Sequence, residues 1–115
     1  MGLKEVMEEL GMDYEGVLNR FGGSSALAER LLRKFPNDPS FAGLREAVKA
    51  KNWDGMLTYA HTLKGVAGNL GFERLYEASQ NMVACLRADD LTGAEKAYGL
   101  VEAEYQRVLN GISKL

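Results

Sequence analysis

The chain is poor in several residue types, and each shortage narrows the function classes open to it. Among its 115 residues there are one cysteine, one histidine and two prolines. The single cysteine, Cys85, cannot form an internal disulfide, which favours a reducing compartment such as the cytoplasm. One histidine and one cysteine are too few ligands for a typical zinc or haem site.

Long apolar runs and a strong charge of either sign are also absent. No run approaches the roughly 20 apolar residues that span a membrane, and the first residues lack the apolar segment of a signal peptide. The formal net charge of −2 gives no reason to expect nucleic acid or a membrane surface as a partner. We therefore expect a cytoplasmic protein that binds neither.

What the chain does have is helical periodicity. Apolar residues make up 46% and charged residues 26% of the sequence, as in ordinary globular proteins. Apolar residues recur at spacings of three and four, and no stretch alternates as a strand would. The sequence predicts a single all-α domain over residues 1–115. Its expected form is an up-and-down antiparallel four-helix bundle with short additional N-terminal helices.

Capping residues and breakers predict where the helices begin and end. Short oxygen-bearing side chains accept hydrogen bonds from the free N–H groups at a helix start, and they precede most of the periodic segments. These residues are Asp13, Ser24 or Ser25, Ser40, Asn52 and Asp90. Pro36 and Pro39 predict a break or kink, and Gly71 is placed to end a helix in the left-handed conformation. The expected helices span residues 3–10, 13–20, 25–35, 40–51, 53–70, 73–88 and 91–109.

The only histidine lies within the predicted helix over about residues 53–70. An α-helix turns about 100° per residue, so positions around its circumference can be counted from His61. Four apolar residues fall within about 40° of the opposite pole and mark the face expected to be buried. They are Tyr59, Leu63, Val66 and Leu70. A lone helical histidine is most often a solvated surface residue, and His61 is accordingly expected to face away from the core.

The residues beside His61 are unusual for a helix surface. Lys64 lies roughly 60° to one side, Gly65 about 40° to the other and Gly68 about 20° away. Each glycine costs about 1 kcal/mol relative to alanine in a helix interior. Two glycines beside one histidine indicate either close packing of a neighbouring helix or close approach of another protein to His61.

The histidine segment and its flanks resemble a known family. The run His-Thr-Leu-Lys-Gly at residues 61–65, followed by Ala67, Leu70 and Gly71, is similar to the signature of histidine-containing phosphotransfer (Hpt) domains. Other segments fit in the right order, so the resemblance spans nearly the whole chain. These are residues 11–14 with Leu18, residues 20–23, Leu31, Leu32, Phe35, residues 52–54 and residues 89–91.

The resemblance implies a function. His61 would accept a phosphoryl group from a receiver-domain aspartate and pass it to another receiver, as a phosphocarrier in a multistep two-component phosphorelay without kinase activity of its own. Receiver domains of response regulators or hybrid histidine kinases would be the partners. Mg²⁺ would belong to those receivers, and no cofactor or metal is expected in this chain. We expect a monomer, and the Met1 start with its well-formed opening favours a free-standing protein over a piece of a larger kinase.

The residues around His61 suit this chemistry. A free imidazole is mostly neutral at pH 7 and offers a nitrogen lone pair, and phosphoryl transfer depends chiefly on positioning and charge stabilisation. Lys64 could offset charge on the phosphoryl oxygens or be a solvated surface lysine. Gly65 and Gly68 would leave room for the loops of a partner. Leu57, about 40° from His61, would add an apolar docking patch or pack along the helix flank.

Other interpretations stay open. A docking-only module would bind receivers without carrying phosphate, although His61 and Lys64 argue against it. A histidine-kinase dimerisation helix pair would have an acidic residue after the histidine and a proline soon afterwards. In this chain Thr62 follows His61, and no proline occurs after Pro39. A metal- or haem-binding bundle would need more ligands than one histidine.

One position departs from the family pattern. Several relatives carry an amide side chain on the helix after the histidine, where this chain has Val83. Gln80 and Asn81 lie nearby in sequence but not on the same line of the helix. Amide support for His61 therefore stays an open question at this point.

Overall fold

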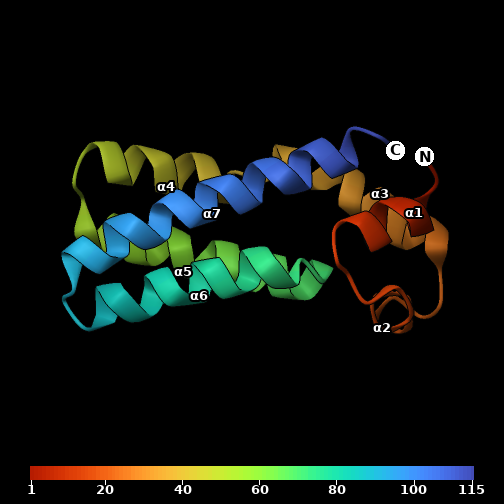
Figure 1. The fold of residues 1–115 in the computed structure, drawn as a ribbon, viewed down its shortest axis with the longest axis horizontal. Coiled ribbons are helices and arrows are strands. Elements are labelled where there is room, and N and C mark those ends of the chain that lie inside the picture. The colour runs from red at the N-terminus through yellow and green to blue at the C-terminus, as the bar shows by residue number, and fades with distance from the viewer.

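The computed structural model describes residues 1–115, and seven α-helices joined by short turns account for most of the chain. Four of them run alternately up and down beside one another, and α1 and α2 lie at one end of this bundle (Figure 1). The prediction of an all-α antiparallel bundle with extra N-terminal helices is confirmed. The helices are α1 (Leu3–Glu9), α2 (Tyr14–Arg20), α3 (Ser25–Lys34), α4 (Ser40–Lys49), α5 (Trp53–Leu70), α6 (Glu73–Arg87) and α7 (Leu91–Ile112).

The two prolines separate α3 from α4, as the sequence predicts. A 3-10 turn, η1 (Phe35–Asn37), contains Pro36 and connects the two helices. The expectation that Ser40 caps α4 is wrong. Pro39 occupies the N-cap position, and the Asp38 carboxylate accepts a hydrogen bond from the N–H of Ser40 at 2.9 Å. Because Pro39 already has helical backbone angles, Ser40 lies inside the helix.

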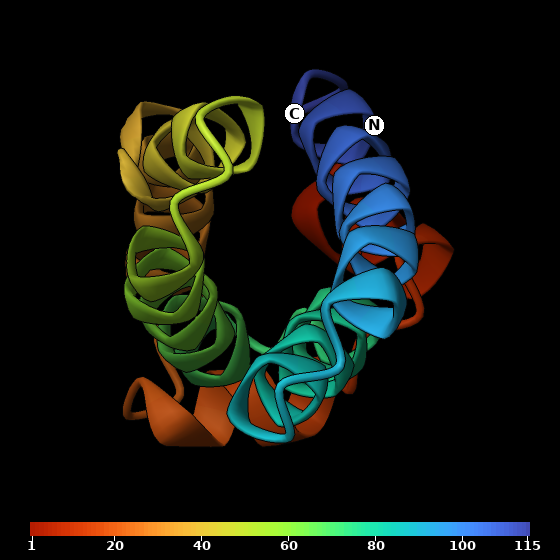
Figure 2. The ribbon, with the colours of Figure 1, turned by 90° about the vertical axis from the view of Figure 1, so that its left-hand side faces the viewer.

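One hydrophobic core runs along the bundle, and the four long helices surround it in the view along their axes (Figure 2). Aromatic rings connect the first helix of the bundle to the last. The ring of Phe41 on α4 stacks on Tyr105 of α7 with centroids 4.0 Å apart and on Tyr98 at 6.1 Å. Such ring pairs add to the stabilisation from burial alone. The bundle is therefore closed by side chains between α4 and α7.

Tyr59 is less buried than the sequence analysis expected. Its side chain keeps 40% of its accessible surface, although it lies on the side of α5 that faces α4. The ring lies over Gly43 of α4, where any added Cβ would overlap it. The angular position of Tyr59 on α5 does not show which residue of α4 will face it. In the structure that residue is Gly43, at the edge of the contact between the two helices. Tyr59 therefore covers the α4–α5 contact from outside.

None of the helices combines the length and the apolar character needed to cross a membrane. The charged side chains stand at the surface, with one buried exception. Glu104 on α7 is 7% exposed. Its carboxylate accepts hydrogen bonds from Arg107 at 2.8 Å and from Arg74 of α6 at 2.9 Å. Arg107 also donates to the carbonyl of Leu10 at 3.1 Å, so this network joins α7 to α6 and to the end of α1.

The network predicts a pH dependence of stability. Burial by itself raises the pKa of Glu104, but the hydrogen bonds and charges of Arg107 and Arg74 outweigh it and lower the pKa below the ordinary value of 4.5. A carboxyl with a lowered folded-state pKa contributes stability above its unfolded pKa and loses it as the pH falls through the folded value. We therefore expect the free energy of unfolding to fall below about pH 4.5.

Replacement of Glu104 tests this expectation. Glu104→Gln should lower the free energy of unfolding at pH 7 by about 1–2 kcal/mol, because charged hydrogen bonds are lost and Arg74 remains largely solvated. Urea titrations from pH 3 to pH 7 measure the effect, and the variant should show a shallower acid dependence than the wild type. Glu95→Gln, an exposed change on the same helix, is the matched control. Identical acid profiles for Glu104→Gln and the wild type would contradict the assignment.

Candidate functional site

The helix that carries His61 is held at both ends by the predicted caps. The Asn52 side chain accepts a hydrogen bond from the N–H of Gly55 at 3.0 Å. At the other end, Gly71 adopts a φ of 85° in the left-handed region, and a Cβ there would overlap the side chain of Val17 on α2. These caps define where α5 begins and ends. They therefore place His61 near the middle of an 18-residue helix.

α5 has one buried face and one open face. His61 is exposed, and its ring makes no hydrogen bond within the chain. The neighbouring hydroxyls of Thr58 and Thr62 donate to carbonyls of the preceding turn, at 3.1 Å and 2.9 Å, and so do not engage the imidazole. Both ring nitrogens are free to meet a partner. The buried residues of α5 are Met56, Ala60, Leu63, Ala67 and Leu70.

The two glycines beside His61 have different surroundings. A Cβ on Gly65 would meet nothing within 4 Å, so no packing inside the chain requires a glycine there. A Cβ on Gly68 would lie 3.0 Å from Cδ2 of Tyr76 on α6. Gly68 therefore allows close helix packing, whereas the surface at Gly65 is open to something outside the chain. Close helix packing therefore accounts for Gly68, while the docking explanation for Gly65 stays a prediction.

Lys64 and Leu57 lie on the side of His61 that faces α6. Around the helix they fall on the same side of His61 as Gly68, which contacts α6. Lys64 is half-buried, and its ammonium has no ion-pair partner in the chain. Leu57 is half-buried and packs against the core, so flank packing accounts for part of its role. The part of Leu57 that stays exposed is available to a docking partner, and that use stays a prediction.

No amide from α6 supports the imidazole in this structure. Val83, at the position where relatives carry an amide, is 2% exposed and belongs to the core. Gln80 and Asn81 are exposed and line a shallow depression along α6, and neither is hydrogen-bonded to His61. No three His, Cys, Asp or Glu side chains gather into a group that could hold a metal ion.

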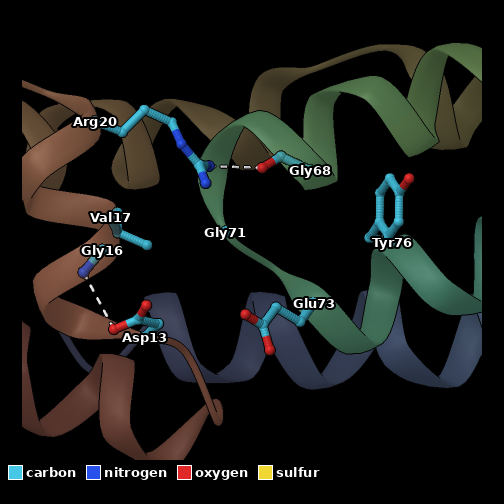
Figure 3. A pocket seen from close by; sticks show the side chains of 8 residues that line it. All are labelled: Asp13, Gly16, Val17, Arg20, Gly68, Gly71, Glu73 and Tyr76. Atoms are coloured by element: carbon cyan, nitrogen blue, oxygen red, sulfur yellow. Dashed lines mark hydrogen bonds between the residues drawn. The ribbon is translucent and has the colours of Figure 1, made fainter.

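The sequence analysis missed a contact made by Arg20. Its Nη1 donates to the carbonyl of Gly68 at 2.7 Å (Figure 3) and to the carbonyl of Asn69 at 2.8 Å. The last carbonyls of a helix lack partners within the helix, and a cation is favoured beside them. Arg20 thereby ties α2 to the C-terminal end of α5. No local signal reveals this contact, because 48 residues separate Arg20 from Gly68.

A comparison with protein families identifies the family to which this chain belongs. The family model described as "Hpt domain" matches residues 24–111 of the 115-residue chain. The chain belongs to the Hpt domain family. Hpt domains carry out histidine phosphotransfer in phosphorelays. Comparisons with curated proteins and with solved structures gave no match.

The matched segment of this Hpt domain contains α3, α4, α5 with the single histidine, α6, and α7 except for Ile112. α1 and α2 precede that segment. The contact of Arg20 with the end of α5 is therefore made by a residue that precedes the matched segment.

Proposed function

We propose that His61 accepts a phosphoryl group from a receiver-domain aspartate and passes it to a second receiver in a multistep phosphorelay. One observation carries the proposal. The only histidine of an Hpt-family chain lies exposed on α5 with both ring nitrogens free of hydrogen bonds. Histidine phosphotransfer needs a histidine that a partner can reach, and this chain has a single candidate.

The transfer requires little beyond correct placement. The lone pair of one ring nitrogen attacks the phosphorus of the aspartyl phosphate in line, and an N–P bond forms as the P–O bond to the aspartate breaks. The aspartate leaves as a carboxylate with the electron pair, and the imidazole proton stays on the other nitrogen. The chain supplies positioning and charge, which dominate phosphoryl-transfer catalysis. Mg²⁺ and the aspartate would come from the receiver.

Lys64 is proposed to offset negative charge on the phosphoryl oxygens. It lies one turn beyond His61 and has no carboxylate partner that would neutralise it. We expect Lys64→Ala to slow transfer from a phosphorylated receiver about three- to tenfold. The reason is that a partly solvated pair of the Lys64 ammonium and a phosphoryl oxygen stabilises by roughly 1 kcal/mol. Rapid-quench measurement of label transfer checks this. Lys96→Ala on α7 is the control, and equal rates for Lys64→Ala and the wild type would exclude the role.

The docking surface is proposed to centre on His61 and the open backbone at Gly65, with Gly68 and the exposed edge of Leu57 beside them. We further propose that the protein acts as a monomer, because the bundle buries its own apolar faces. Few large apolar side chains stay exposed, and they are Met1, Tyr59 and Leu100. Sedimentation equilibrium that shows a tight dimer would contradict the monomer.

The test of the function is direct transfer. Receiver domains from the same genome are phosphorylated on their aspartate with a labelled acyl phosphate and mixed with the protein. The His61→Ala variant is treated in the same way as a control. We expect an acid-labile, base-stable label on the wild type and none on the control. Binding of receivers without any transfer would instead support the docking-only module.

A further inference from the structure

A pocket that the transfer chemistry does not use lies between α2 and the turn from α5 to α6 (Figure 3). Its volume is about 320 Å³. Three helices contribute its walls, so it exists only in the folded chain. The residues that matter for its chemistry are Asp13, Val17 and Arg20 from α2 and its N-cap, Gly68 from α5, and Glu73 and Tyr76 from α6.

The pocket opens beside the proposed docking surface. Gly68 belongs to both, and it lies about 20° around α5 and about 10 Å along it from His61. A standard protein interface covers about 800 Å² on each partner, which corresponds to a radius of roughly 16 Å. A receiver seated over His61 would therefore reach the mouth of this pocket.

Two carboxylates, Asp13 and Glu73, and one guanidinium, Arg20, line the pocket, so its charged side chains carry a net charge of −1. Asp13 accepts a hydrogen bond from the N–H of Gly16 at 3.1 Å, and the Arg20 guanidinium is held by two carbonyls of α5. The backbone N–H of Glu73 donates to the carbonyl of Gly71 at 3.0 Å, but its carboxylate makes no hydrogen bond or ion pair in the chain. Figure 3 shows both carboxylates on one side of the pocket and the guanidinium on the other. A cation that enters would find Glu73 available and Asp13 beside it.

The remaining walls suit a long aliphatic side chain. Val17 and the ring of Tyr76 supply apolar surface, and Gly68 contributes backbone without a side chain. Lysine and arginine carry an apolar stem below a charged head, and the face of a tyrosine ring attracts a cation. The pocket thus combines the two properties that a basic side chain requires.

We propose that this pocket binds a lysine or arginine side chain on the docking surface of the receiver, and that Glu73 helps to determine which receivers are accepted. The proposal rests on the proposed function, because the receiver must sit over His61. α2, which lines one side of the pocket, precedes the segment matched by the family model. Glu73 acts on binding and does not touch the phosphoryl group.

Charge reversal at Glu73 tests the proposal. Glu73→Lys should raise the KM for a phosphorylated receiver about tenfold or more, with a kcat close to that of the wild type. Glu73→Gln should raise the KM less and weaken its dependence on salt. Glu95→Lys, on the exposed face of α7, makes the same change in net charge and should leave the KM unchanged. A receiver in which a basic docking residue is changed to glutamate should restore transfer to Glu73→Lys.

A second donor separates the failure of this proposal from failure of the proposed function. A small phosphoramidate can label His61 without docking and reports whether the histidine is intact in each variant. An unchanged KM for Glu73→Lys with every active receiver would overturn the pocket proposal and leave the function standing. If Glu73→Lys lost labelling by phosphoramidate as much as labelling by the receiver, the pocket proposal would also be overturned, since the substitution would then act at His61. A wild type labelled by phosphoramidate but by no receiver would overturn both.

Discussion

The His61→Gln variant is expected to accept no phosphoryl group from any receiver, while it folds as stably as the wild type. Glutamine keeps a polar side chain of similar length, but its amide nitrogen has no lone pair available for attack on phosphorus. His61 is exposed and unbonded in the chain, so its removal should change the free energy of unfolding by less than about 0.5 kcal/mol. Label transfer and urea titration measure the two effects.

Binding distinguishes the chemical cause from a docking defect. His61→Gln should still bind an uncharged receiver with an affinity within a few-fold of the wild type, as measured by isothermal titration calorimetry. Label retained on His61→Gln would place the acceptor on another residue and contradict the assignment of His61. Loss of binding together with loss of label would show instead that the histidine serves chiefly as a docking contact.

Gly65→Leu is expected to stabilise the protein and to impair its transfer reaction. Gly65 lies in a helix interior where a Cβ meets nothing within 4 Å, so leucine should raise the free energy of unfolding by about 0.5–1 kcal/mol through helix propensity. The new side chain would stand about one turn from His61, in the space proposed for the receiver. A displacement of about 1 Å between reacting groups can cost roughly 100-fold in rate, and we expect a loss of about 10- to 100-fold.

Gly99 provides a matched control for this variant. It is also an exposed helical glycine at which an added Cβ would meet nothing within 4 Å, but it lies on α7. Gly99→Leu should show the same gain in stability without any loss of transfer. Equal transfer by Gly65→Leu and Gly99→Leu would show that the surface at Gly65 is not a docking surface.

Features that depend on neighbours within one helical turn were predicted well. The side chains of Asp13, Asn52 and Asp90 each accept a hydrogen bond from the N–H three residues later, as expected for N-caps. Gly71 ends α5 in the left-handed conformation. The cap at Ser40 was mispredicted because Pro39, one residue earlier, already has helical backbone angles.

The candidate site was predictable only in part. Its helix, the outward direction of His61 and the neighbouring residues follow from the helical repeat, which is a local property. The difference between Gly65 and Gly68 does not, because it depends on where the ring of Tyr76 on α6 lies. The exposure of Tyr59 was mispredicted for the same kind of reason, since its neighbour on α4 is a glycine.

The sequence by itself determined the helices, most of their caps, the membership of a phosphotransfer family and the identity of the only histidine. The tertiary structure alone decided which surface beside His61 is open, how Arg20 holds the end of α5, and that Glu104 is buried between two arginines. Backbone hydrogen bonds and caps join residues three or four apart, so local sequence encodes them. Arg20 reaches across 48 residues and Arg107 across 97. Contacts of that kind exist only once the apolar faces of the helices have packed together.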